Sequence, residues 1–421
     1  MKKSILIMVL GAWGLASLCA GGGKQDKPAS GGGVELYMFI SQPEYADAIN
    51  TLLAEYKKVA PKVTINYETT QDDYPTLLKA KLNSGDVPDI FTSTSGKEID
   101  MYREYSMTLA SQPLMQTMLP AVQDSMKALS DGSGPYGFAI KGNFFGILYN
   151  KEIFARAGIT EFPQTLDALE AACEAIAALG IRPFTSGFAE WWVYKHTAMN
   201  FFGTASNDAV ALVKQFESGQ AKIASYPRLY NDLFRYIDLV VKYGDAKPLE
   251  TNLNSEIAAF ARGEAAMTNG QGAWIEADVL KVNPNIKIGF DGYPVSSNPG
   301  ECKVVTGADQ AMRVSNQSKH QQELLDFVNW WYTSDYGKSW FVNIAGVVPP
   351  VVVSSLPNME VVKQGTALVQ QEGSAPLSII YSTDAFHQAF GEALQAYVGG
   401  IATKDQTCAL IERKWVELEG R

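Results

Sequence analysis

Several signatures of enzymes and metalloproteins are missing from this 421-residue sequence. Its histidines are few and far apart: His196, His320 and His387. Its cysteines are also widely spaced, with no Cys-x-x-Cys pair and no neighbouring histidine: Cys19, Cys173, Cys302 and Cys408. Zinc sites need clustered thiolate and imidazole ligands, so this spacing argues against one. We therefore expect neither a metal site nor a cofactor.

The common catalytic motifs are also missing. The sequence contains no nucleophile-elbow, zinc-protease, phosphate-loop or EF-hand pattern. A glycosidase needs only two carboxylates, and the 45 acidic residues offer many pairs, none of which stands out. We predict a non-enzyme and keep an extracellular carbohydrate-active enzyme as the alternative from a different class.

Positive charge is scarce as well. Acidic residues outnumber basic ones by 45 to 35, and no dense Lys/Arg run follows residue 3. Nucleic-acid binding depends on clustered positive charge that neutralises phosphates. The composition therefore excludes nucleic acid as an expected partner.

The first 33 residues are typical of an exported protein. Lys2 and Lys3 precede residues 4–18, which are uncharged and mostly apolar. This stretch is too short for a comfortable membrane span, so it indicates a secretion signal over residues 1–18. The arrangement resembles a bacterial lipoprotein signal, in which Cys19 would carry the lipid and residues 19–33 would form a flexible leash. Such a protein is tethered on the outer face of the cytoplasmic membrane.

The residues before Cys19 depart from the usual lipoprotein pattern. That pattern prefers leucine three residues before the cysteine and a small residue directly before it, where this chain has Ala16 and Leu18. The alternative is an ordinary secreted protein that is cleaved nearby and gives Cys19 no role. Either interpretation places the protein outside the cytoplasm.

After the leash, strand and helix patterns alternate. Strands are predicted at residues 34–40 and 63–69 and from residue 89, with helices at residues 45–59 and 73–84 between them. This order predicts a parallel α/β sheet with right-handed crossovers. Ligands bind outside the carboxyl ends of the strands in such sheets, which draws attention to the loops after the first and third strands.

The rest of the chain is mainly helical in pattern. Helices are predicted at residues 166–179, 208–216, 226–243, 254–262, 318–332, 335–342, 383–398 and 404–418, and strands at residues 286–290 and 304–305. Cys173 and Cys408 fall within these helices, where small apolar packing is the expected role. Without Cys19 the cysteine number is odd, so at least one thiol stays free.

Four segments resemble family 1 extracellular solute-binding proteins. Residues 85–91 (GDVPDIF) resemble the family's G-D-x-P-D turn, and residues 136–158 resemble its G-x-x-Y-N-K-x-x-F-x-x-A-G passage. Residues 260–274 (FARGEAAMTNGQGAW) resemble F-x-x-G-x-A-A-M…G-x-W, and residues 314–349 resemble a helix pair that ends in G-x-x-P. The segments follow the family order and cover most of the mature chain.

The resemblance implies an α/β, two-lobed periplasmic-binding-protein-like fold of type II with a ligand cleft between the lobes. The first lobe is expected to comprise residues 34–142 plus 307–347, and the second residues 143–306 plus 348–421. Hinge closure would bury the ligand. The closed receptor, expected to be a monomer, would then dock on the membrane permease of an ABC importer. Relatives with this pattern mostly bind a sugar or oligosaccharide.

Aromatic and polar residues near the expected cleft suit a sugar, because sugar C–H faces stack on rings and hydroxyls need polar partners. Trp191 and Trp192 follow a predicted short strand, and we expect one to stack on the ligand and one to enter the core. Trp274 follows a glycine-rich turn and is the other stacking candidate. The remaining ligand-binding candidates are Gln42, Glu44, Thr94, Ser95, Asn143, Asn269, Gln271, Asp309, Phe386 and His387. Trp330, Trp331 and Trp340 have core-like spacing.

Other ligands are possible on the same fold. Ferric-binding relatives use adjacent tyrosines, and the sequence has no Tyr-Tyr pair. A phosphorylated polyol needs cationic cleft residues, and the candidate loops carry only Lys97 and Lys141. A polyamine would suit the acidic balance and stays an alternative.

Overall fold

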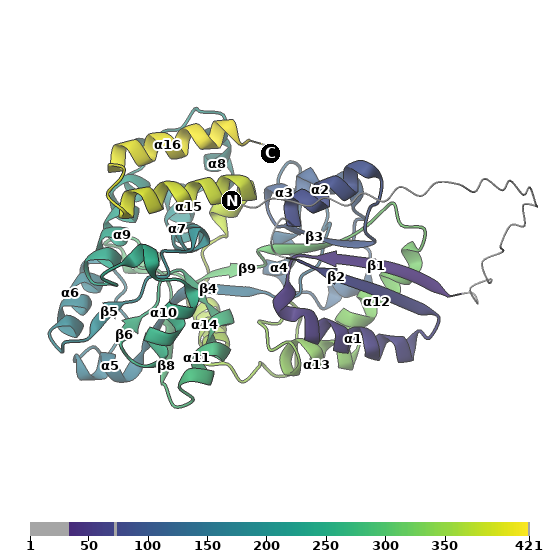
Figure 1. Cartoon of the computed structure of the whole chain (residues 1–421), viewed down its shortest axis with the longest axis horizontal. Helices are drawn as coiled ribbons and strands as arrows, with labels where there is room; N and C mark the ends of the chain where they lie inside the picture. Colours follow the sequence, from purple (N-terminus) through teal and green to yellow (C-terminus); the bar gives the residue numbers. More distant parts are fainter. Residues whose placement is uncertain (1–32, 71–73, 420–421) are drawn as a thin grey trace, which may run out of the picture.

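Two β-sheets covered by helices form two lobes (Figure 1). The structure is a computed structural model that describes residues 33–70 and 74–419. The sheet of the first lobe runs in the order β10–β3–β1–β2, with β1 at Val34–Ile40, β2 at Val63–Thr69, β3 at Ile90–Thr94 and β10 at Gln310–Val314. Strand β1 pairs in parallel with β2 and β3, which confirms the predicted parallel arrangement, and β10 is antiparallel to β3.

Amphipathic helices cover the first sheet and bury a tryptophan-rich core. They are α1 (Ala46–Val59), α2 (Tyr74–Ser84), α3 (Lys97–Met101), α4 (Pro120–Ser125), α12 (Gln321–Thr333) and α13 (Asp335–Asn343). Trp331 and Trp340 are fully buried, with ring centroids 5.0 Å apart, and the Trp340 indole N–H donates to the Ala48 carbonyl at 2.7 Å. The predicted packing role of these tryptophans is confirmed.

The second lobe surrounds a mixed sheet. It contains β4 (Asn143–Asn150), β5 (Arg182–Phe184), β6 (Ala265–Met267), β7 (Gln271–Gly272), β8 (Ile288–Asp291) and β9 (Val305–Gly307). Its helices are α5 (Lys151–Arg156), α6 (Leu166–Ala177), α7 (Trp191–Ala205), α8 (Ala209–Glu217), α9 (Leu233–Lys242), α10 (Leu253–Ala261), α11 (Glu276–Val282), α14 (Glu360–Glu372), α15 (Asp384–Val398) and α16 (Lys404–Glu417). Helices α15 and α16 close the chain over α7 and α8 (Figure 1).

Strands β4 and β9 of the second sheet run side by side and reach toward the first lobe (Figure 1). Asn143 at the start of β4 pairs with Gly307 at the end of β9, and Gly142 forms a bridge with Val348. Three segments that are distant in sequence therefore meet where the lobes join. A Cβ on Gly307 would lie 2.6 Å from the Leu377 side chain, which explains why the tight junction has a glycine there.

Two local predictions are corrected by the structure. Residues 226–243 were expected to form one regular helix, but a π-helical turn at Arg228–Asp232 precedes α9. Trp191 and Trp192 were expected at a strand end, but they open helix α7, because the chain turns at Gly187 with a φ of 61° and Glu190 is still extended. The helical periodicity of α7 is obscured by its burial on nearly every side.

The structure describes three of the four cysteines but not Cys19, the candidate anchor. Cys173, Cys302 and Cys408 are free and buried, and the expected helical positions of Cys173 and Cys408 are confirmed. Cys19, the secretion signal and all but the last residue of the leash lie outside the described residues. Among the helices of the described part of the chain, none has the length and apolarity needed to cross a membrane.

Candidate functional site

A cavity of about 770 Å³ lies between the lobes, next to the junction of β4 and β9. Loops at the carboxyl ends of β1 and β3 line one side, and the start of α7 and the turn before α11 line the other. The candidate residues that line it are Glu44, Thr94, Asn143, Trp191, Trp192, Trp274 and Asp309. The structure therefore brings together residues from six separate parts of the sequence.

The floor of the cavity is a polar network at the lobe junction. The Asn143 side-chain amide donates to the Asp309 carboxylate at 2.5 Å, and the Asp309 carbonyl accepts the Ser95 N–H at 3.0 Å. Gln310 also lines the cavity, and its side chain is hydrogen-bonded to that of Gln42. Gln42 and Ser95 are themselves almost fully buried and lie behind the lining, where they orient it.

An aromatic wall lines the same cavity from the second lobe. It consists of Phe145, Trp192, His196 and Trp274, whose ring centroids lie about 5 Å from their neighbours. Trp192 and His196 are four residues apart on α7 and so share a helix face. Trp274 approaches through Gly272, where a Cβ would lie 2.0 Å from the Phe144 carbonyl oxygen and 2.3 Å from the Trp274 ring. Only glycine permits this approach.

Both lobes contribute charged groups to the cavity. Lys141 lies beside Tyr45 and Trp274, with its ammonium 5.8 Å and 5.9 Å from their ring centroids. Burial opposes its charge, but Tyr45, Asp309 and Glu44 outweigh burial and raise the pKa of Lys141 above its ordinary value. Burial also disfavours the charged form of Glu98 in the first lobe. Together with the negative charge of Asp384 at the start of α15, it raises the pKa of Glu98 to about 7.

Besides Gln42 and Ser95, four more candidate residues lie behind the cavity lining. Asn269 and Gln271 are fully buried; the Asn269 backbone N–H and the Gln271 side-chain amide donate to the two carboxyl oxygens of Glu256, at 2.9 Å and 2.8 Å. Phe386 stacks on Trp415 in the core with ring centroids 4.2 Å apart. The buried His387 places Nε2 2.9 Å from the Ile379 carbonyl and Nδ1 3.4 Å from Asp384. These contacts place the four residues in a supporting layer.

Several lining residues were not among the sequence-based candidates. They include Tyr45, Glu98, Phe145, Lys195, His196, Gln310 and Asp384, together with Lys141, which was noted only as a nearby cation. Lys195 and His196 lie four residues after Trp191 and Trp192, so a helix that begins at Trp191 would have placed all four in neighbouring turns. Glu98 and Asp384 come from opposite lobes, and no sequence spacing connects them.

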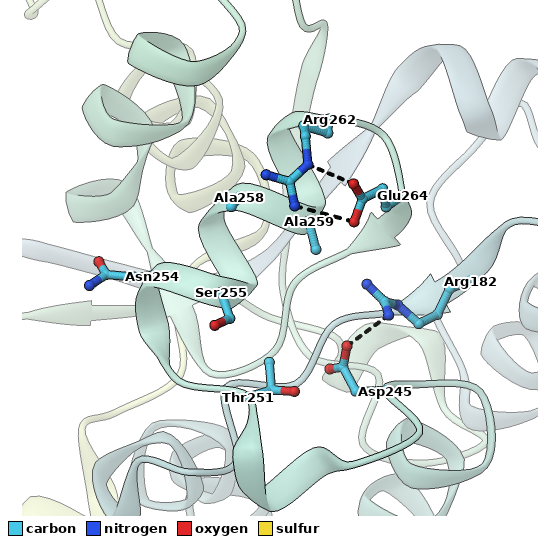
Figure 2. A pocket seen from close by; sticks show the side chains of 9 residues that line it. All are labelled: Arg182, Asp245, Thr251, Asn254, Ser255, Ala258, Ala259, Arg262 and Glu264. Atoms are coloured by element: carbon cyan, nitrogen blue, oxygen red, sulfur yellow. Dashed lines mark hydrogen bonds and ion pairs between the residues drawn. The ribbon is translucent and has the colours of Figure 1, made fainter.

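A second hollow, of about 450 Å³, lies on the surface of the second lobe beside β5, β6 and α10 (Figure 2). Its charged side chains are paired with one another: Arg182 with Asp245 at 3.0 Å and Arg262 with Glu264 at 2.6 Å. The interlobe cavity has both aromatic rings and polar side chains in its lining, whereas no described residue that lines the second hollow is aromatic. The interlobe cavity is therefore the stronger candidate site.

Comparison with known proteins agrees with this arrangement. The family model of the bacterial extracellular solute-binding proteins matches residues 41–338. The chain belongs to this family. The "Multiple sugar-binding protein" of Streptococcus mutans serotype c is 24% identical over 79% of this chain and 80% of its own length. The "Melibiose/raffinose/stachyose-binding protein MelE" of Bacillus subtilis is 23% identical over 70% of this chain and 69% of its own length.

Solved structures confirm the expected architecture. A binding protein from Bacillus subtilis, in an open conformation, superimposes with a TM-score of 0.79 at 19% identity, covering 93% of this chain and 98% of its own. Identity at this level supports the fold alone. The expected two-lobed periplasmic-binding-protein-like fold is confirmed, and the family assignment places the protein outside the cytoplasm.

Proposed function

We propose that this protein is a receptor that captures a sugar or oligosaccharide in the interlobe cavity and delivers it to an ABC importer. The observation that carries the proposal is that the aromatic wall with Trp192 and Trp274 and the polar floor with Asn143 and Asp309 line one cavity. Sugars offer an apolar C–H face to such rings and hydroxyls to such amides and carboxylates. The names of the two related proteins support the same ligand class.

The proposal includes hinge closure, docking and a tether. The strands that join the lobes at Asn143 and Gly307 are positioned to act as the hinge, and closure would exclude water from the ligand. A membrane permease would then recognise the closed form. Lipidation of Cys19 would hold the receptor near that permease at high effective concentration. Mass spectrometry of the native mature protein tests the tether. An unmodified Cys19 would refute the lipid anchor and leave the proposed receptor function unaffected.

Calorimetric titration with raffinose and stachyose, two sugars named for a relative, tests the ligand class. Trp274→Ala and Trp192→Ala should each weaken binding by at least about tenfold, because each removes a stacking surface. Trp330→Ala is the matched control, since Trp330 stacks on Tyr336 in the first lobe and does not line the cavity. Unchanged affinity in both cavity variants would refute the proposed site.

The two alternatives, a polyamine receptor and an enzyme, give outcomes that differ from those of a sugar receptor. Spermidine in place of the sugars tests the polyamine alternative, which the cavity carboxylates Glu44, Asp309 and Asp384 would serve. Binding of spermidine with no response to either sugar would replace the sugar proposal. We further propose that the protein is not an enzyme, so incubation with stachyose should return intact sugar, and any hydrolysis product would refute the receptor function.

A further inference from the structure

His196 is a buried imidazole at the centre of the aromatic wall. Its side chain is only 8% exposed, and it lines the interlobe cavity. The ring centroids of Phe145, Trp192 and Trp274 lie 4.8, 5.2 and 5.4 Å from its own. A polar ring in such an apolar position needs a partner for each nitrogen, because an unsatisfied buried group is costly.

One ring nitrogen has a protein partner, and this partner defines the tautomer. Nδ1 lies 3.1 Å from the backbone carbonyl oxygen of Gly270. A carbonyl oxygen can only accept a hydrogen bond, so Nδ1 must carry the proton. Gly270 holds this carbonyl in place through a turn with a φ of 70°, in a site where a Cβ would lie 2.5 Å from Val193.

The electrostatic surroundings of His196 keep the ring neutral. Burial lowers the pKa of His196 well below its ordinary value, and the neighbouring charge of Lys195 on α7 acts in the same direction. Lys141 before β4 and His387 on α15 lower the pKa further, and the hydrogen bond to the Gly270 carbonyl opposes them. A neutral imidazole with its proton on Nδ1 has a free lone pair on Nε2.

Nε2 is not used by the protein. Over residues 33–70 and 74–419, the structure gives this nitrogen no hydrogen-bond partner. We infer that His196 Nε2 accepts a hydrogen bond from a hydroxyl of the sugar ring that stacks on Trp192 and Trp274. This inference rests on the proposed function and adds a specificity determinant to it. While the ring is neutral, Nε2 can accept a hydrogen bond from a ligand hydroxyl but offers no proton to a ligand carboxylate.

A matched pair of substitutions separates the two nitrogens. In His196→Asn the side-chain amide can still donate to the Gly270 carbonyl, but no atom remains at the position of Nε2. In His196→Gln the longer side chain can place its carbonyl oxygen there as an acceptor. Titration with raffinose should show roughly a 10- to 100-fold loss for His196→Asn and recovery of most of that loss in His196→Gln. Equal affinities of wild type and His196→Asn would overturn the inference.

Imidazole ¹⁵N spectroscopy tests the acceptor directly. In the free protein at pH 7, the proton should lie on Nδ1, and saturating raffinose should shift the Nε2 resonance as it accepts a hydrogen bond. A proton on Nε2, a doubly protonated ring or an Nε2 resonance that raffinose does not move would each overturn the inference. If raffinose and stachyose fail to bind the wild-type protein, the sugar proposal falls, while the position of the proton in the free protein still decides whether Nε2 is an acceptor.

Discussion

Glu98 makes the stability of this protein depend on pH in an unusual direction. Its carboxylate lines the cavity and accepts the Thr94 backbone N–H at 2.7 Å. Burial, with a smaller contribution from the negative charge of Asp384, raises the pKa of Glu98 from its ordinary value of 4.5 to about 7, and the hydrogen bonds from Thr94 oppose both. The folded protein therefore holds a proton on Glu98 over a range in which the unfolded chain has released it.

The size and sign of the effect follow from this pKa difference. Between pH 4.5 and pH 7 the folded state binds the extra proton, so the free energy of unfolding falls as the pH rises through this window. Each pKa unit corresponds to about 1.4 kcal/mol, which makes about 3 kcal/mol the upper bound. The side chain is partly open to the cavity, so we expect about 1–3 kcal/mol. Glu98→Gln removes the titrating group and keeps an acceptor for Thr94.

Urea unfolding of wild type and Glu98→Gln between pH 4.5 and pH 8.5 measures this effect, because the other titrations cancel in the difference. The variant should gain stability relative to wild type as the pH rises through the window. In an Asp384→Asn background the gain should be smaller, since the charge that raises the Glu98 pKa is gone. A difference between wild type and Glu98→Gln that stays constant across this pH range would refute the reasoning.

Three further predictions concern other contacts. Lys97→Met should lower the free energy of unfolding by about 3 kcal/mol, because it removes the ammonium that contacts the buried Glu217 carboxylate across the lobes at 2.7 Å. Lys97→Arg keeps the positive charge and is the control. Equal free energies of urea unfolding for the two variants would contradict this prediction. Gly272→Ala should displace Trp274, changing its fluorescence and weakening raffinose binding at least about tenfold, and native affinity would be the contrary result. Burial raises the thiol pKa values, to about 12 at two positions, so Ellman's reagent at pH 8 should label these residues rapidly only after unfolding: Cys173, Cys302 and Cys408.

The regular parts of the fold could be predicted because local pattern and tertiary environment agree. Strands β1 and β2 have the bounds predicted from the sequence, and α1, within the predicted helix at residues 45–59, buries Ile49 and Leu52 at helical spacing. Helix α7 could not be recognised because both of its faces pack against other elements, which removes the apolar–polar period that marks a surface helix. The π-helical turn before α9 is only five residues long, too short for a periodic sequence pattern to reveal it.

The same reasoning explains which cavity residues could be predicted from the sequence. Glu44 and Thr94 could be found because strand ends in a parallel sheet converge, and this convergence is a property of topology. Asn269 and Gln271 lie in an equally suitable loop, but their side chains turn inward: the Gln271 amide donates to the buried Glu256, and the Asn269 amide donates to the Ser186 carbonyl. The sequence alone does not show that buried groups of the fold use these two side chains. His196 was missed for the opposite reason: its importance comes from the Gly270 carbonyl, 74 positions away, which uses one nitrogen and leaves the other for the cavity. Whether a polar residue in this protein serves the ligand or the fold is thus decided by how many of its hydrogen bonds the fold itself has already satisfied.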